Sequence, residues 1–212
     1  MSALDRLFGK DTRFYDFLEA GAAAAKAATL EIASLIPQLS EPANPNLLSG
    51  LAQCRRKHKR VSQDTTEALC KTFVTPLERE DIEALSTALY KITKNVEKIG
   101  ERLTISPSGV QIDQFQRQLK MLEGAADLVV QLVGHLRTKK HGEEIRDDYE
   151  RLQAIEGDAD KLMNELLRDL YHGSLDARVV VFLKDLFELI EKGIDRCRDA
   201  ASVVFHVALK YS

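Results

Sequence analysis

The chain has 212 residues, of which 44% are hydrophobic and 30% are charged, and its formal net charge is −3. This length allows one sizeable hydrophobic core or two small ones fused together. The net charge excludes a globally basic nucleic-acid binder, while local basic patches stay compatible with it. Three cysteines at wide spacing fit neither a disulfide framework nor a zinc knuckle, so we expect a reducing, cytoplasmic compartment.

The N-terminal residues carry no apolar segment of the kind that a secretory signal needs. No stretch approaches the roughly 18 uninterrupted apolar residues of a membrane-spanning helix. The most apolar early stretch, residues 21–36, contains Lys26 and Glu31 and is typical of a core helix. We therefore predict that the chain does not cross a membrane. Any association with the inner face of a membrane would be peripheral and would depend on a partner.

Apolar residues recur at three- and four-residue steps along most of the chain, and no stretch alternates with period two, which predicts helices without strands. In the first half, helices are expected at about 12–36, 47–71 and 76–103. The first ends at Pro37, and a loop rich in proline and asparagine follows at 40–46. Thr75, Pro76 and Glu78 form a helix start signal, with Thr75 as the N-cap and Glu78 closing a capping box.

The second half repeats this plan, with apolar seams at 115–136, 145–166 and 183–204. A break is expected near Gly142, and a short turn at 172–174 precedes the last helix. The simplest architecture is all-α, with two similar antiparallel three-helix bundles built from an internal repeat, over residues 1–105 and 106–212. The repeat aligns the second and fifth helices at an offset of 96 residues, and the third and sixth at an offset of 101.

Carboxylates four residues apart mark the last two helices of the second half. They are Glu156, Asp160, Glu191, Asp195 and Asp199. Glu-x-x-x-Asp spacing places both carboxylates on one face of a helix, so two such helices side by side could hold a cation. Hard oxygen ligands suit iron, manganese, magnesium or calcium, and they also accept zinc or nickel. The alternative is a solvated acidic face, because such spacing is common in any Glu-rich helix.

In the first half, only Asp64 keeps an acid at an equivalent position of the repeat. The other positions are occupied by Arg60, Tyr90, Lys94 and Lys98. The sequence therefore predicts a lopsided molecule, with an acidic C-terminal bundle able to bind metal and a basic N-terminal bundle without that site.

A basic run begins at Arg55 and ends at Arg60. It is interpreted either as a solvated face or as a surface that contacts phosphate, anionic lipid or nucleic acid. Nucleic acid is the weaker candidate, because no aromatic residues interleave with the basic ones. Catalysis has little support as well, because the chain has no Gly-rich phosphate loop, no nucleophile elbow and no Glu-x-x-His pair.

Residues 73–82, 155–160 and 184–201 resemble the PhoU-like family, and more specifically the short accessory proteins often encoded beside Pit-type inorganic phosphate transporters. The resemblance implies an all-α fold of two similar three-helix bundles, with Glu/Asp-x-x-x-Asp motifs that can bind multinuclear metal clusters. It also implies a role in phosphate uptake and its regulation, without a demonstrated reaction. The family motif matches Glu156, Asp160, Glu191, Asp195 and Asp199.

We therefore expect a non-enzymatic, cytoplasmic regulatory or accessory protein for inorganic phosphate transport. It would act by contact with a Pit-type transporter or a signalling protein, and divalent or iron ions would be its cofactors. Formation of a homo-oligomer is compatible with exposed apolar seams, and no specific nucleic-acid partner is expected. Two alternatives stay open: a structural helical adaptor without metal, and a carboxylate-metal hydrolase or oxidase.

Overall fold

The computed structural model describes residues 12–36, 48–138 and 143–211. Within these ranges the chain forms α-helices and a short 3-10 helix, with no strand. The elements are α2 (Arg13–Leu35), α3 (Ser49–Lys71), α4 (Arg79–Thr104), η2 (Ile112–Gln114), α5 (Gln116–Thr138), α6 (Glu143–His172) and α7 (Ala177–Lys210). The predicted loop at 40–46 and the predicted break near Gly142 lie outside the described residues.

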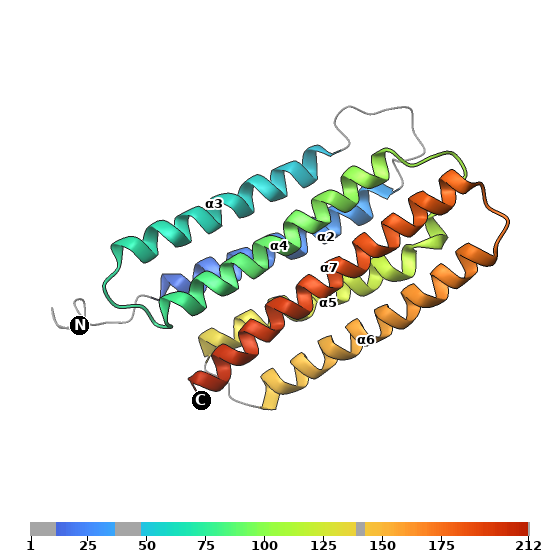
Figure 1. The fold of residues 1–212 in the computed structure, drawn as a ribbon. Coiled ribbons are helices and arrows are strands. Elements are labelled where there is room, and N and C mark those ends of the chain that lie inside the picture. Colours follow the sequence, from blue (N-terminus) through green and yellow to red (C-terminus); the bar gives the residue numbers. More distant parts are fainter. Residues whose placement is uncertain (1–11, 37–47, 139–142, 212) are drawn as a thin grey trace.

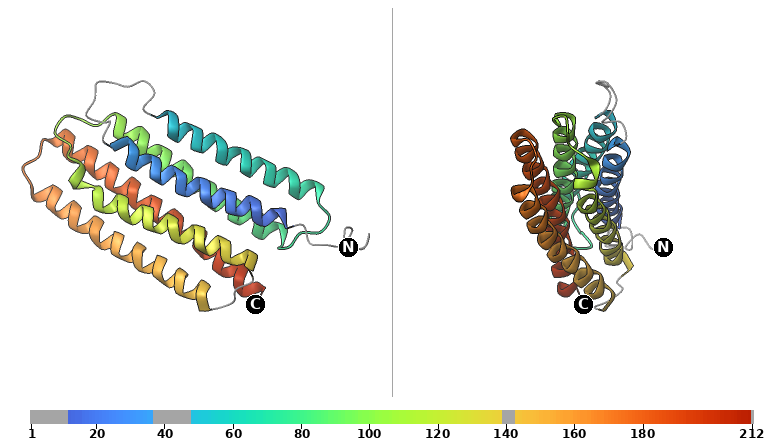
Figure 2. Two further views of the ribbon diagram at one scale, coloured as in Figure 1. Left: turned by 180° about the vertical axis from the view of Figure 1, so that it is seen from behind. Right: turned by 90° about the vertical axis from the view of Figure 1, so that its right-hand side faces the viewer.

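α4 and α7 pack antiparallel at the centre of the molecule (Figure 1). α3 packs beside α4 and α6 packs beside α7, so that α3, α4, α7 and α6 lie side by side across one face. We call this the four-helix face. α2 and α5 form a second layer behind it and contact each other (Figure 2). The helices α2–α4 and α5–α7 follow the same plan, and the predicted all-α fold of two similar three-helix bundles is confirmed.

A single apolar core runs through both units, because α4 and α7 bury their apolar sides against each other. Side chains pack closely against Gly193, where an added Cβ atom would lie 3.0 Å from the Leu122 side chain and 3.1 Å from the Asn95 side chain. The Asn95 amide donates a hydrogen bond of 2.8 Å to the Leu189 carbonyl oxygen. The two units are therefore stabilised by each other as well as by their own packing.

The start of α4 differs from the prediction. The helix begins at Arg79, and Glu78 precedes it in an extended conformation without a side-chain cap. The Thr75 hydroxyl donates to the Leu77 carbonyl oxygen at 2.7 Å instead of capping the helix. Because Pro76 and Leu77 are buried in the turn, the helix starts after them, and the prediction of Thr75 as N-cap is wrong.

Burial gives α3 and α6 a repeat register that differs from the predicted one. Their buried residues correspond at an offset of 101: Leu51 with Leu152, His58 with Ala159, and Leu69 with Leu170. The predicted offset of 96 is wrong for this pair. It would match the same α3 residues with the exposed Asp147, Ala154 and Glu165. A five-residue shift turns a helix by roughly 140°, which moves a buried side to the surface.

The other two helix pairs follow the same offset of 101. In α4 and α7 the buried pairs include Leu89 with Ile190, Val96 with Cys197, and Leu103 with Val204. In α2 and α5 they include Ala25 with Ala126 and Ile32 with Val133, and Phe14 of α2 corresponds to Phe115, the residue just before α5. One offset for all three pairs means that the second unit repeats the first without an insertion between its helices.

His58 is a polar residue within this core, with only 1% of its surface exposed. Its Nδ1 atom lies 2.6 Å from the Thr93 hydroxyl, and its ring meets Tyr90 edge-on at 5.4 Å between centroids. Burial lowers the pKa of His58 to about 4, because a charged imidazole would lose its hydration there. The folded protein therefore holds His58 neutral.

We predict that His58 makes the protein less stable in mild acid. Below pH 6.5 the unfolded chain binds a proton that the folded state excludes down to about pH 4, so the free energy of unfolding falls as the pH falls through this window. The loss approaches about 3 kcal/mol at its lower end. His58→Gln should show a shallower fall than the wild type in urea unfolding between about pH 7 and pH 4.5. His206→Gln, at an exposed histidine, is the control, and equal slopes for wild type and H58Q would contradict the prediction.

Candidate functional site

The five acids predicted to bind metal lie on the adjacent helices α6 and α7, and we call them the acidic cluster. Its members are Glu156, Asp160, Glu191, Asp195 and Asp199. Glu191 is the point where the helices meet, because its carboxyl hydrogen-bonds with Asp160 and experiences the charges of Glu156 and Asp195. The structure therefore brings Glu156, Asp160 and Asp195 close to Glu191.

Partial burial raises the pKa of Glu191 to about 7, and the negative charges of Asp195, Asp160 and Glu156 add to the effect. The protonated form is favoured because an ionised Glu191 would lose hydration and be repelled by its neighbours. Negative charge therefore outweighs positive charge around the Glu191 carboxyl.

Arg198 lies among the remaining acids. Its Nη2 atom donates to Asp195 Oδ1 at 3.1 Å and lies 3.7 Å from Asp199 Oδ1. Its Nε atom lies 3.7 Å from Glu156 Oε1, beyond hydrogen-bond distance, and has no other partner in the described part of the chain. The guanidinium of Arg198 thus supplies positive charge to three members of the acidic cluster, and Asp199 also accepts from Arg196 at 2.9 Å.

The carboxylates do not converge on one point. Within the described residues, no group of three or more His, Cys, Asp and Glu side chains is arranged to hold a metal ion. The oxygen donors have the right chemistry for a hard cation, but Asp195 is directed at Arg198 and Asp199 at Arg196 and Arg198. In this arrangement the acidic cluster does not fit a metal ion.

The first unit carries an inverted set at the equivalent positions. At the offset of 101, the five acids correspond to Arg55, Lys59, Tyr90, Lys94 and Lys98. Asp64 corresponds to Glu165 instead, so the assignment of Arg60 and Asp64 to this site was wrong. We call Arg55, Lys59, Lys94 and Lys98 the basic cluster. At these five positions of the first unit no acid remains.

One ion pair is conserved between the units with its charges exchanged. In the first unit, Arg55 of α3 pairs with Glu97 of α4. At the same positions of the second unit, Glu156 of α6 pairs with Arg198 of α7. In each unit an ion pair therefore joins the outer helix to the central helix at the same level. The outer helix supplies the positive charge in the first unit and the negative charge in the second.

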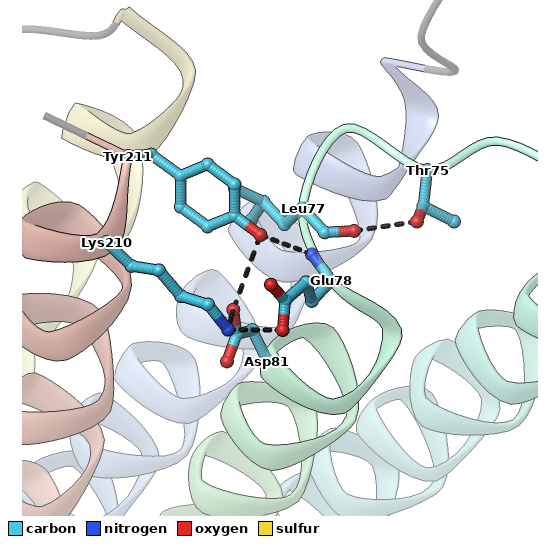
Figure 3. Close-up of polar contacts among 6 residues, drawn as sticks. All are labelled: Thr75, Leu77, Glu78, Asp81, Lys210 and Tyr211. Carbon is cyan, nitrogen blue, oxygen red and sulfur yellow. Dashed lines mark hydrogen bonds and ion pairs between the residues drawn. The ribbon is translucent and has the colours of Figure 1, made fainter.

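The segment 73–82 contacts the C-terminal ends of both α3 and α7. Arg79 donates to the carbonyl oxygens of Leu69 and Thr72, which closes the C-terminal end of α3. The end of α7 also binds there (Figure 3): Lys210 pairs with Glu78 and Asp81, and the Tyr211 hydroxyl accepts from the Glu78 N–H at 2.6 Å. The role of this segment is structural, and nothing in the sequence indicated that Lys210 and Tyr211 reach it.

The fold and its repeat are those of PhoU-like proteins of known structure. A PhoU-like protein from Shewanella oneidensis MR-1 superposes with a TM-score of 0.78 at 19% identity, over 93% of this chain and 99% of the other. A second protein from that organism, named a PhoU-like phosphate regulatory protein, gives a TM-score of 0.76 at 19% identity, over 94% and 100%. The predicted resemblance to PhoU-like proteins is confirmed for the fold.

In sequence, the chain is similar to the UPF0111 protein YkaA of Bacillus subtilis (strain 168). The two are 25% identical over 145 residues, which cover 67% of this chain and 69% of YkaA. No model of a known protein family matches the chain. Among the described residues, no helix is long and apolar enough to span a bilayer.

We predict that the contribution of Glu191 to the free energy of unfolding is less favourable in alkaline than in mildly acidic solution. Between its unfolded pKa of 4.5 and its folded pKa of about 7, the folded state binds a proton that the unfolded chain has lost, so the free energy of unfolding falls as the pH rises. Glu191→Gln should be more stable than the wild type by about 1 kcal/mol near pH 8, allowing for solvent screening, and similar to it near pH 4.5.

Chemical unfolding in the presence of a chelator measures this difference. Glu188→Gln, at an exposed acid four residues from Lys184 on the same helix, is the matched control. A stability difference between E191Q and the wild type that is the same at both pH values would contradict the prediction.

Proposed function

We propose that the chain is a non-enzymatic regulatory or accessory protein of inorganic phosphate transport, acting by contact with other proteins. The observation that carries the proposal is the PhoU-like fold over nearly the whole chain, shared with a protein named as a phosphate regulatory protein. The partner we propose is a Pit-type transporter or a signalling protein, at the cytoplasmic face of the membrane.

The charge distribution supports a contact function. The basic and acidic clusters lie on the outer sides of neighbouring helices, where Lys59, Lys94 and Asp160 are exposed. Opposite charges gathered in separate areas steer association and favour correctly oriented partners. A structural adaptor without metal is the second candidate, and the observation that favours it is the position of Arg198 among the acids.

Deletion of the gene should change the uptake of inorganic phosphate, and the wild-type gene should restore it. The measurement is uptake of labelled phosphate at low and high external concentrations, because a regulator changes the response to supply. The control is a second copy carrying a stop codon early in α2. Uptake that is unchanged by the deletion at every concentration would contradict the regulatory role.

We further propose that a divalent cation binds the acidic cluster only when Arg198 leaves it. Arg198→Met keeps an unbranched apolar stem and removes the guanidinium group with its charge, leaving Glu156, Asp195 and Asp199 without that compensation. We expect R198M to bind Mn²⁺ at least about tenfold more tightly than the wild type in titration calorimetry.

Adding Glu191→Ala and Asp195→Ala to R198M should abolish the gain, because these acids are then no longer available as ligands. Arg196→Met is the matched control, since Arg196 contacts Asp199 alone among the acidic cluster. Two results together would contradict the proposal that the acidic cluster binds a metal ion. They are equal Mn²⁺ affinity of R198M and the wild type, and the absence of iron or other metal from both in elemental analysis.

A further inference from the structure

Both clusters lie on the four-helix face. Lys91 of α4 and Arg196 and Asp199 of α7 line one groove between these helices. α2 and α5 cover the opposite sides of α4 and α7 (Figures 1 and 2). The groove therefore opens on the four-helix face. Lys94 and Lys98 follow Lys91 at helical spacing and therefore share its side of α4.

The two helices at the edges of this face carry opposite net charges. α3, at one edge, has six Lys and Arg residues against two Asp and Glu residues. α6, at the other edge, has ten Asp and Glu residues against four Lys and Arg residues. The two helices occupy equivalent places in the repeat, so one scaffold carries opposite charges at its two edges.

Several of these charges lack a partner of opposite sign. Within the described part of the chain, Lys59, Lys94 and Lys98 form no ion pair, and neither does Asp160 or Glu191. Like charges repel one another within each cluster, and the two clusters lie on different helix pairs of the same molecule. A surface that presents an opposite charge to each cluster would relieve both repulsions.

The clusters lie at matching heights along the helices. α4 and α7 are antiparallel, with Lys210 against Glu78 near one end and Arg102 against Asp185 toward the other. Lys94 and Asp195 therefore both lie near the middle of the pair. Lys59 lies at this level too, because its neighbour His58 contacts Thr93.

We propose that the four-helix face binds a second copy of this chain, with the basic cluster of each copy on the acidic cluster of the other. A two-fold axis parallel to the helices, running above the groove between α4 and α7, places α3 and α4 of each copy over α6 and α7 of its partner. Both sets of contacts form together, as an isologous interface requires. A two-fold axis across the helices would place like charges on each other.

A second copy fits this face better than a surface of one charge sign. An anionic membrane or a nucleic acid would attract Lys59 and Lys94 but would repel Asp160, which lies at the other edge. Only a partner that carries both signs at the same separation complements the whole face, and a copy rotated about the axis given above has that arrangement. This interface goes beyond the proposed function and is tested without reference to phosphate transport.

The test is a pair of charge-reversed variants whose mixture should associate. Lys59→Glu/Lys94→Glu/Lys98→Glu reverses three charges of the basic cluster, and Asp160→Lys/Asp199→Lys reverses two charges of the acidic cluster. We expect the wild type to dimerise at about 50 mM NaCl, with a Kd at least about tenfold higher at about 500 mM. Each variant alone should be a monomer, and an equimolar mixture should form a heterodimer.

Sedimentation velocity measures all four samples, and circular dichroism checks that each variant is folded. Arg117→Glu/Lys120→Glu reverses two exposed charges on α5, in the other layer, and should leave the dimer intact. A wild type that stays monomeric up to about 100 µM at low salt would overturn the proposal. So would a dimer that survives both reversals, or variants that fail to associate when mixed. Binding of the wild-type monomer to anionic vesicles would favour a membrane as the partner instead.

Discussion

The packing of α4 against α7 is the contact on which the rest of the structure depends. It places Gly193 against Asn95 and buries one apolar core shared by both units. Substitution at these buried positions creates cavities or clashes, whereas exchange of an exposed charge costs little. The two units have accordingly kept the same buried positions at an offset of 101 while their outer faces have taken opposite charges. The shared core thus fixes where the two clusters lie and leaves their sign free.

The ion pairs of Arg198 hold the acidic cluster together only weakly. The side chains of Glu156, Asp195 and Asp199 are 26%, 36% and 41% exposed, and that of Arg198 is 38% exposed. Pairs at this exposure are each worth about 1 kcal/mol or less, far below a fully buried pair. A divalent cation or a lysine from another molecule can therefore compete with Arg198 at modest cost. An arrangement that does not fit a metal ion as it stands is thus compatible with a site that accepts other cations.

Periodicity was sufficient to predict the helices and their pairing into two units, because a buried stripe repeats every three to four residues in α4 and α7. It was insufficient for the register of α3 against α6. There the search for matching acids favoured Asp64 with Asp160, and only burial shows that Leu51 corresponds to Leu152. Counting acids also overlooked Arg198, which lies on the same helix as three of them. The contact of Lys210 with Glu78 joins residues 132 positions apart, and no local pattern carries that information.

One face cannot bind two partners at once. If the four-helix face is occupied by a second copy, a transporter or signalling protein must bind elsewhere or must displace that copy. The turn between α3 and α4 offers a different surface, because Phe73 is fully exposed there and lies at one end of the helices. An exposed aromatic side chain has few rotatable bonds, so it loses little conformational entropy when a partner buries it. Self-association through the charged clusters and docking of a partner through Phe73 would use separate surfaces. Docking through the basic cluster would instead compete with self-association, so that the dimer and the partner complex would exclude each other.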